Sequence, residues 1–213
     1  MLDPRLLKEV GDLVKFEYPI FLFMPQRKTP LESGNFYHIY NRGNNRQNIF
    51  FERENYIYFL RLLKEHLIKN AVDIVGYCLM PNHYHLLVYL RDETLSDAMK
   101  SLSLAYTKAI NKRFNHSGVL FQGRFQSIHI QETEYLVNLS RYIHLNPVKA
   151  GIVNHPGEWE FSSYLEYAGL RPGTLPKIEY IKTQIESESI YQQFLLDHNL
   201  PNSTDFKKLL LDD

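Results

Sequence analysis

The chain has 213 residues, of which 44% are hydrophobic and 23% charged, and its formal net charge is zero. This length and composition predict one globular domain with extensions. The single cysteine, Cys78, excludes a disulfide framework and any multi-cysteine zinc or iron–sulfur site, so we expect a reducing compartment, the cytoplasm. The apolar stretches are too short to cross a bilayer and no signal peptide is evident, so we expect no membrane association.

The neutral total charge hides an asymmetry along the chain. Residues 99–149 contain seven basic side chains against two acidic ones, whereas residues 179–213 contain seven acidic against three basic. A basic middle suggests an anionic partner, although charge alone fits two ordinary solvated faces equally well. A net charge of zero argues against a protein that coats DNA indiscriminately, because such binding depends on neutralising phosphates.

The first third of the chain predicts an arm, a strand and a helix. Residues 1–34 mix a short helical pattern with a segment interrupted by prolines, which favours an arm outside the core, and the compact domain is predicted to begin at Asn35. Residues 36–40 have the composition of a strand and lead into a polar loop over 41–46. Apolar residues then recur at three- and four-residue intervals over 54–70, which predicts a helix with one buried face.

The middle of the chain predicts a hairpin followed by a helix and a strand. Residues 72–80 and 83–90 have strand patterns and are separated by a tight two-residue connection, so the two strands should pair. Residues 95–114 form a second amphipathic pattern, and residues 124–131 are expected to be a fourth strand.

A third helix is predicted to begin at Thr133, as its cap, and to end at Pro147 and Gly151. The order strand, helix, strand, strand, helix, strand, helix suits a split β-α-β sandwich of the α+β class, an antiparallel sheet with helices on one face. Residues 159–164 then resemble a packed aromatic extension, and residues 172–213 predict one or two small tail helices.

His83 and His85 are the first candidates for chemistry. Residues two apart in a strand project from the same face, so the two imidazoles can lie side by side while Tyr84 points the other way. With an oxygen ligand, such a pair can hold manganese or magnesium near a phosphate. A His-x-His pair alone is more often not a ligand set, so the prediction depends on its place at the rim of a rigid sheet.

Tyr142 and Asn146 are the second candidates, because they are four apart and share a helix face. A tyrosine hydroxyl can attack a phosphodiester and conserve its energy as a phosphotyrosine, but a phenol pKa of about 10 requires assistance at neutral pH. A divalent cation can orient the phosphate, with the Asn146 amide completing its coordination. From these residues alone, the alternative is that Tyr142 packs at the sheet edge and Asn146 marks the helix end.

Four motifs taken together closely resemble the single-tyrosine HUH transposases, especially the REP-associated tyrosine transposases, and they occur in that family's order. The motifs are residues 37–43, 80–87, 123–125 and 142–151. The resemblance implies the ferredoxin/RRM-like sandwich of HUH endonucleases and a division into three parts. These parts are an N-terminal arm over 1–34, an HUH catalytic domain over 35–168 and a C-terminal helical extension over 169–213.

The resemblance also implies the activity and its residues. His83 and His85, on either side of Tyr84, would bind Mg²⁺ or Mn²⁺, with Asn146 as a third ligand from the helix, and Tyr142 would be the nucleophile. The enzyme would cleave and rejoin single-stranded DNA beside a REP-like hairpin, through a 5′-phosphotyrosine and a free 3′-hydroxyl, and two chains can pair as a homodimer. Tyr106 is a rival nucleophile, because it also lies on a helix downstream of the histidines. It ranks second, because its motif matches the helix that precedes the tyrosine helix in the family.

Eight polar side chains are candidates for contact with DNA. They are Arg42, Asn44, Asn45, Arg46, Lys108, Lys112, Arg113 and Arg124. For Lys108 and Lys112 taken singly, a solvated surface lysine is the simpler interpretation.

Two other functions compete with the transposase. One is a sequence-specific nucleic-acid-binding protein without chemistry, a domesticated transposase; the two histidines, the tyrosine and the amide four residues further on favour the enzyme over it. The other is a zinc hydrolase, which is disfavoured because no glutamate accompanies the histidines.

Overall fold

The computed structural model describes residues 30–182 and 191–193. Contacts divide the chain into Met1–Pro30 and Leu31–Asp213, and all of the architecture below belongs to the second part. The helical pattern predicted near the N-terminus and most of the predicted tail helices lie outside the described residues. None of the described helices is long and apolar enough to cross a membrane.

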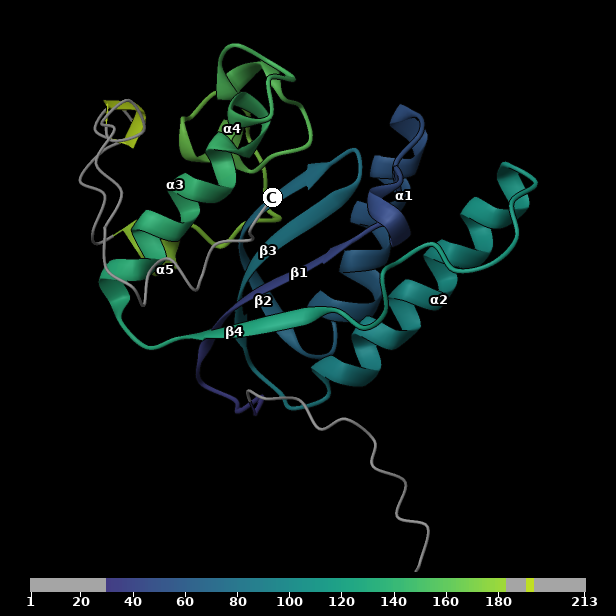
Figure 1. Ribbon diagram of the computed structural model, residues 1–213. Coiled ribbons are helices and arrows are strands. Elements are labelled where there is room, and N and C mark those ends of the chain that lie inside the picture. Colours follow the sequence, from purple (N-terminus) through teal and green to yellow (C-terminus); the bar gives the residue numbers. More distant parts are fainter. Residues whose placement is uncertain (1–29, 183–190, 194–213) are drawn as a thin grey trace, which may run out of the picture. The chain divides into compact units, whose positions relative to one another are not determined.

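Four antiparallel strands form one sheet in the order β2-β3-β1-β4 (Figure 1). They are β1 (Phe36–Arg42), β2 (Val72–Met80), β3 (His83–Leu90) and β4 (Gln126–Ile130). The predicted hairpin is the pair β2 and β3, which have the predicted bounds. The α+β sandwich with an antiparallel sheet is therefore confirmed, and β3 and β1 are its two inner strands.

Two long helices cover one face of this sheet (Figure 1). They are α1 (Arg53–Leu62), which continues as the π-helical segment η3 (Leu63–Ile68), and α2 (Leu95–Arg113). Their apolar side chains form one core with Tyr84, Leu86 and Val88, the alternate residues of β3 that point to this face. The prediction of amphipathic helices over 54–70 and 95–114 is confirmed.

The third helix, α3 (Thr133–Lys149), lies on the opposite face of the sheet (Figure 1). Its residues Leu136, Leu139 and Ile143 pack in a second core with Val75 and Leu87 of the strands. The expectation of helices on one face is corrected here, because β2 and β3 are buried on both faces and α3 covers the second one.

The ends of α3 also differ from the prediction. Glu132, not Thr133, occupies the N-cap position, and Pro147 lies inside the helix rather than at its end. A proline has no backbone donor, so α3 lacks the hydrogen bond from residue 147 to the carbonyl of Ile143. The chain leaves the helix at Gly151, whose φ of +67° is the left-handed conformation that glycine adopts most easily.

The segment after α3 covers the free edge of β2. Leu79 N–H donates to Phe161 O and Ser163 N–H donates to Tyr77 O, each at 2.9 Å, and the Trp159 indole donates to Leu79 O at 3.0 Å. An uncovered edge strand can pair with other chains, so this segment completes the sheet. The predicted aromatic extension over 159–164 is thus a packed part of the fold.

Short helical elements complete the described chain. They are η2 (Asn44–Arg46), η4 (Pro156–Glu158), α4 (Tyr164–Tyr167) and α5 (Glu179–Lys182).

Candidate active site

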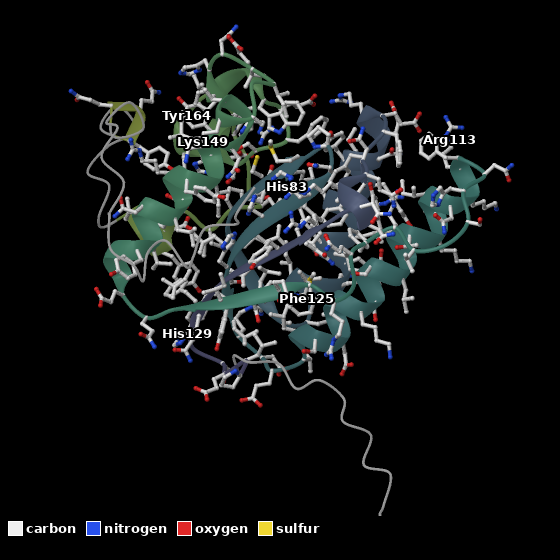
Figure 2. The ribbon with its side chains drawn as sticks, in the orientation of Figure 1. His83, Arg113, Phe125, His129, Lys149 and Tyr164 are labelled. Atoms are coloured by element: carbon white, nitrogen blue, oxygen red, sulfur yellow. The ribbon has the colours of Figure 1, made fainter. Side chains whose placement is uncertain are left out.

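His83 and His85 lie at the start of β3 and point to the face that α3 covers. The neighbouring strand β1 fixes their position, because Arg42 stands opposite His83 and Tyr40 opposite His85 in the antiparallel register. Tyr84 points to the other face, where it packs against Phe59 with ring centroids 5.1 Å apart. The predicted alternation is confirmed. Figure 2 shows His83 within the sheet.

Hydrogen bonds at Nδ1 orient both imidazoles. His83 Nδ1 lies 2.6 Å from Asn82 Oδ1, and an amide oxygen only accepts, so Nδ1 of His83 carries the proton and donates. His85 Nδ1 lies 2.9 Å from Nε2 of His38 on β1. The two rings of the pair meet edge to face with centroids 5.0 Å apart. In neutral His83 the nitrogen without a proton is therefore Nε2.

His85 is fully buried, and its Nε2 atom has no hydrogen-bond partner among the described residues. Burial lowers the pKa of His85 well below the usual value of 6.5, and the neighbouring His38 and His83 lower it further. The imidazole is therefore neutral at physiological pH, which is the form that binds metals. A buried nitrogen lone pair of this kind is suited to coordination.

Tyr142 lies across from this pair on α3. Its ring packs edge to face on His85, with centroids 5.8 Å apart, and the side chain is only 5% exposed. The Lys149 ammonium lies 4.6 Å from the centre of the same ring, so a positive charge stands beside the tyrosine. Figure 2 shows Lys149 at the end of α3. The structure thus brings Tyr142 to the histidines.

Tyr106, the rival tyrosine, lies on the other face of the sheet. It belongs to α2 and is fully buried in the core between that helix and the sheet, where its hydroxyl donates to Ile49 O at 2.7 Å. A hydroxyl engaged in this way and separated from His85 by the sheet is a structural group.

Asn146 lies one helical turn beyond Tyr142 and is 4% exposed. Its amide Nδ2 donates to Tyr142 O at 2.9 Å, so this bond does not use the carbonyl oxygen Oδ1. Among the described residues, no three His, Cys, Asp or Glu side chains form a metal-binding group. Two imidazoles and one amide oxygen nevertheless suit Mn²⁺ or Mg²⁺ when phosphate oxygens complete the coordination shell.

A groove of about 230 Å³ lies one strand away from the histidine pair. It is lined by Tyr40, Asn41, Arg42, Gln122, Arg124 and Gln126. Tyr40 connects it to the site, with its ring centroid 6.4 Å from that of His85. Two of the predicted DNA contacts, Arg42 and Arg124, therefore line one groove on the same face as the histidines.

The loop with Asn44, Asn45 and Arg46 lies beside the turn that carries His83. Gly43 N–H donates to Asn82 O at 2.8 Å, and the Asn82 amide reaches Arg46 O at 3.4 Å. Asn45 and Arg46 both adopt positive φ, and both are exposed. The loop is thus placed at the edge of the site, as contact with a DNA strand there requires.

The three remaining basic candidates do not join this group. Lys108, Lys112 and Arg113 lie on α2, which covers the opposite face of the sheet. Arg113 pairs with Glu52 at 3.1 Å, and Figure 2 shows it at the end of α2. A DNA strand bound at the histidines could reach these three side chains only if the DNA wrapped around the protein to the other face of the sheet.

Three further residues contribute to the site although the sequence did not indicate them. They are His38, Asn82 and Lys149. Strand alternation places His38 on the face of Tyr40, but its contact with His85 requires the pairing of β1 with β3. Asn82 precedes His83 directly in the sequence. Lys149 lies seven residues, or two helical turns, after Tyr142, and this spacing could have indicated that the two side chains share a helix face.

The fold and these side chains define a class of protein: an α+β sandwich with two histidines on an inner strand and a tyrosine on the helix that crosses them. The chain matches the family model described as IS200-like transposase over residues 33–146, and it belongs to this family. That match includes the histidine pair, Tyr142 and Asn146.

Two known proteins are similar to this chain. A Haemophilus influenzae protein named "Putative REP-associated tyrosine transposase" is 30% identical over 104 residues, which is 43% of this chain and 58% of that protein. A solved structure of a REP-associated tyrosine transposase bound to a REP hairpin is 20% identical, with a TM-score of 0.55 over 71% of this chain and 93% of the other. This second similarity shows a shared fold.

Proposed function

We propose that this transposase family member cleaves and rejoins hairpin-containing single-stranded DNA, with Tyr142 as the nucleophile. The observation that carries the proposal is the edge-to-face contact between Tyr142 and His85, at 5.8 Å between ring centroids. His85 belongs to the sheet and Tyr142 to the helix that covers it, and the two residues are 57 positions apart in the sequence. If Tyr142 only packed against the sheet, apolar side chains would serve as well as a pair of histidines at this position.

The reaction is an exchange of phosphate esters. The Tyr142 hydroxyl oxygen attacks the phosphorus, and the bond from phosphorus to the 3′-oxygen breaks. The phenol proton leaves to water and the 3′-oxygen takes up a proton, which gives a 5′-phosphotyrosine and a free 3′-hydroxyl. Attack of a 3′-hydroxyl on the phosphotyrosine reverses these steps and rejoins DNA. Lys149 beside the ring stabilises the negative charge that develops on the tyrosine.

His83, His85 and Asn146 would hold the divalent cation, Mg²⁺ or Mn²⁺. When bound, the cation would neutralise charge on the scissile phosphate. The protein prepares this site with a neutral His85 and with hydrogen bonds that engage Nδ1 of both imidazoles. Such partners orient metal-binding histidines in general.

The groove beside the histidines supports single-stranded DNA as the substrate. Arg42 and Arg124 offer guanidinium groups for phosphates or guanine edges, and Tyr40 offers an aromatic face near the site. Among the described residues, neither arginine has a carboxylate within 4.0 Å. We expect Arg42→Ala and Arg124→Ala each to weaken binding and reduce the salt slope by about 1, and Lys112→Ala to leave cleavage unchanged.

The test of the nucleophile compares two tyrosines. Tyr142→Phe should abolish cleavage of a hairpin-containing oligonucleotide and the covalent adduct, while DNA binding persists. Tyr106→Phe is the matched control, because it removes one buried hydroxyl from the other face, and it should cleave like the wild type. Mass spectrometry of the adduct formed with Mn²⁺ identifies the modified residue. An adduct on any residue other than Tyr142 would refute the assignment.

The test of the cation uses chelation and the ligands. EDTA, or His83→Ala with His85→Ala, should stop cleavage, and full activity without a divalent cation would refute the ligand assignment. A wild-type protein that binds hairpin DNA tightly but forms no adduct with either cation would instead support the non-catalytic binding protein.

A further inference from the structure

We propose that His38 is a positioning residue that holds His85 in the tautomer with its proton on Nδ1, so that Nε2 of His85 keeps a lone pair for the metal site. The consequence for metal binding rests on the function proposed above. The tautomer itself can be measured without metal or DNA.

The two imidazoles are built into neighbouring strands. His38 stands opposite Leu87 in the pairing of β1 with β3, and His85 lies two residues from Leu87 on the same face. Both rings are fully buried and nearly parallel, with an angle of 19° and centroids 5.2 Å apart. The contact that joins them is His38 Nε2 to His85 Nδ1, at 2.9 Å.

The direction of this hydrogen bond follows from the other nitrogen of His85. If His38 Nε2 donated, the proton of neutral His85 would lie on Nε2. That atom is buried and has no hydrogen-bond partner among the described residues, so it would be an unsatisfied donor. Burying an unpaired N–H destabilises the fold. If His85 Nδ1 donates instead, Nε2 carries a lone pair that a cation can use.

The first histidine of the pair shows the same arrangement through a different partner. Asn82 Oδ1 can only accept, so His83 also carries its proton on Nδ1. Both coordinating histidines therefore use Nδ1 to donate outward to the protein and Nε2 for the site. Because His38 and Asn82 belong to β1 and to the β2–β3 turn, two separate parts of the fold fix the same tautomer.

The first experiment reads the tautomer directly. Long-range ¹⁵N–¹H spectra of the full chain, without metal or DNA, distinguish protonated from unprotonated imidazole nitrogens. In the wild type, we expect a protonated Nδ1 and an unprotonated Nε2 for His85. His38→Phe keeps an aromatic ring but cannot accept the proton, and it should shift His85 toward the Nε2–H form. His38→Gln can place an acceptor oxygen at the same point and should restore the wild-type pattern.

The second experiment reads metal affinity by water-proton relaxation with Mn²⁺ alone. His38→Phe should weaken Mn²⁺ binding by about 10- to 100-fold, as loss of a partner behind a metal-binding histidine commonly does. His38→Gln should recover most of this loss. His129→Phe is the matched control on β4, since its ring contacts Tyr37 on the other face of the sheet, and it should leave Mn²⁺ binding unchanged.

Two results would overturn the inference: a wild-type His85 with its proton on Nε2, or His38→Phe with unchanged tautomer and Mn²⁺ affinity. If His38→Phe does not fold, the wild-type spectrum and His38→Gln decide the question. A wild type that neither binds Mn²⁺ nor cuts DNA would refute the proposed function, whereas the tautomer spectrum would still test the role of His38.

Discussion

His144 makes the stability of the protein sensitive to acid. It lies on α3 between Tyr142 and Asn146 in sequence but points away from them into the second core. There its Nδ1 lies 2.6 Å from the Tyr191 hydroxyl, and its Nε2 lies 2.7 Å from Ser163 Oγ. Burial of the ring lowers the pKa of His144 from 6.5 to about 3. The folded protein therefore keeps this imidazole neutral through the whole mildly acidic range.

The sign of the effect follows from which state binds the proton first. The unfolded chain protonates His144 near pH 6.5, whereas the folded chain does so only near pH 3. The stabilisation is therefore complete above about pH 6.5 and is lost as the pH falls toward 3. At 1.36 kcal/mol per pK unit, acidification from pH 7.5 to 5 lowers the free energy of unfolding by about 2 kcal/mol through His144 alone.

Urea denaturation of the wild type and of His144→Phe between pH 5 and pH 7.5 measures this term. Phenylalanine fills a similar volume but breaks both hydrogen bonds, so the variant should be less stable at pH 7.5 by about 1–3 kcal/mol. The variant should also lose about 2 kcal/mol less than the wild type on acidification. Buried His85 acts in the same direction in both proteins, so the difference isolates His144. Equal pH dependence in the two proteins would refute the reasoning.

Two further substitutions test how the β2–β3 turn supports the site. Asn82→Ala removes the acceptor at His83 Nδ1 and should weaken Mn²⁺ binding by about 10- to 100-fold, with Asn82→Asp retaining more affinity; equal binding by Asn82→Ala and wild type would contradict this. Gly43→Ala would place a methyl carbon 2.0 Å from Gln47 O, so the backbone of the loop must shift. Urea denaturation should show a free energy of unfolding lower by about 1–3 kcal/mol. An unchanged urea midpoint would contradict this prediction.

Sequence periodicity predicted the strands and helices well because each element has one consistent pattern. The bounds of β2 and β3 were predicted correctly, since both are continuous apolar strands separated by a proline-containing turn. The ends of α3 were predicted less well. A residue that can cap a helix does not always do so, and a proline can lie within the last turn or beyond it, so tertiary packing decides both. Glu132 occupies the cap position, and Pro147 lies inside the helix, two residues before its last residue.

The candidate site was predictable only in part. The side-chain alternation of a strand placed His83 and His85 on one face, and helical spacing placed Tyr142 with Asn146. Pairing between distant strands is not written in local periodicity, so the contact between His38 and His85 required the structure. The same limit applies to the grouping of basic residues, because no local signal separates the groove from the far face of the sheet.

The face of the sheet on which α3 lies can be related to the histidines of β3 as well as to the packing of the core. Tyr84 points into the core beneath α1 and α2, so the histidines on either side of it must point to the opposite face. A nucleophile helix on the same face as α1 and α2 would be separated from the histidines by the sheet. Since β3 is buried on both sides, the face with the histidines also needs a covering layer, and α3 supplies it. The face of Tyr84 therefore determines from which side Tyr142 can contact the histidines.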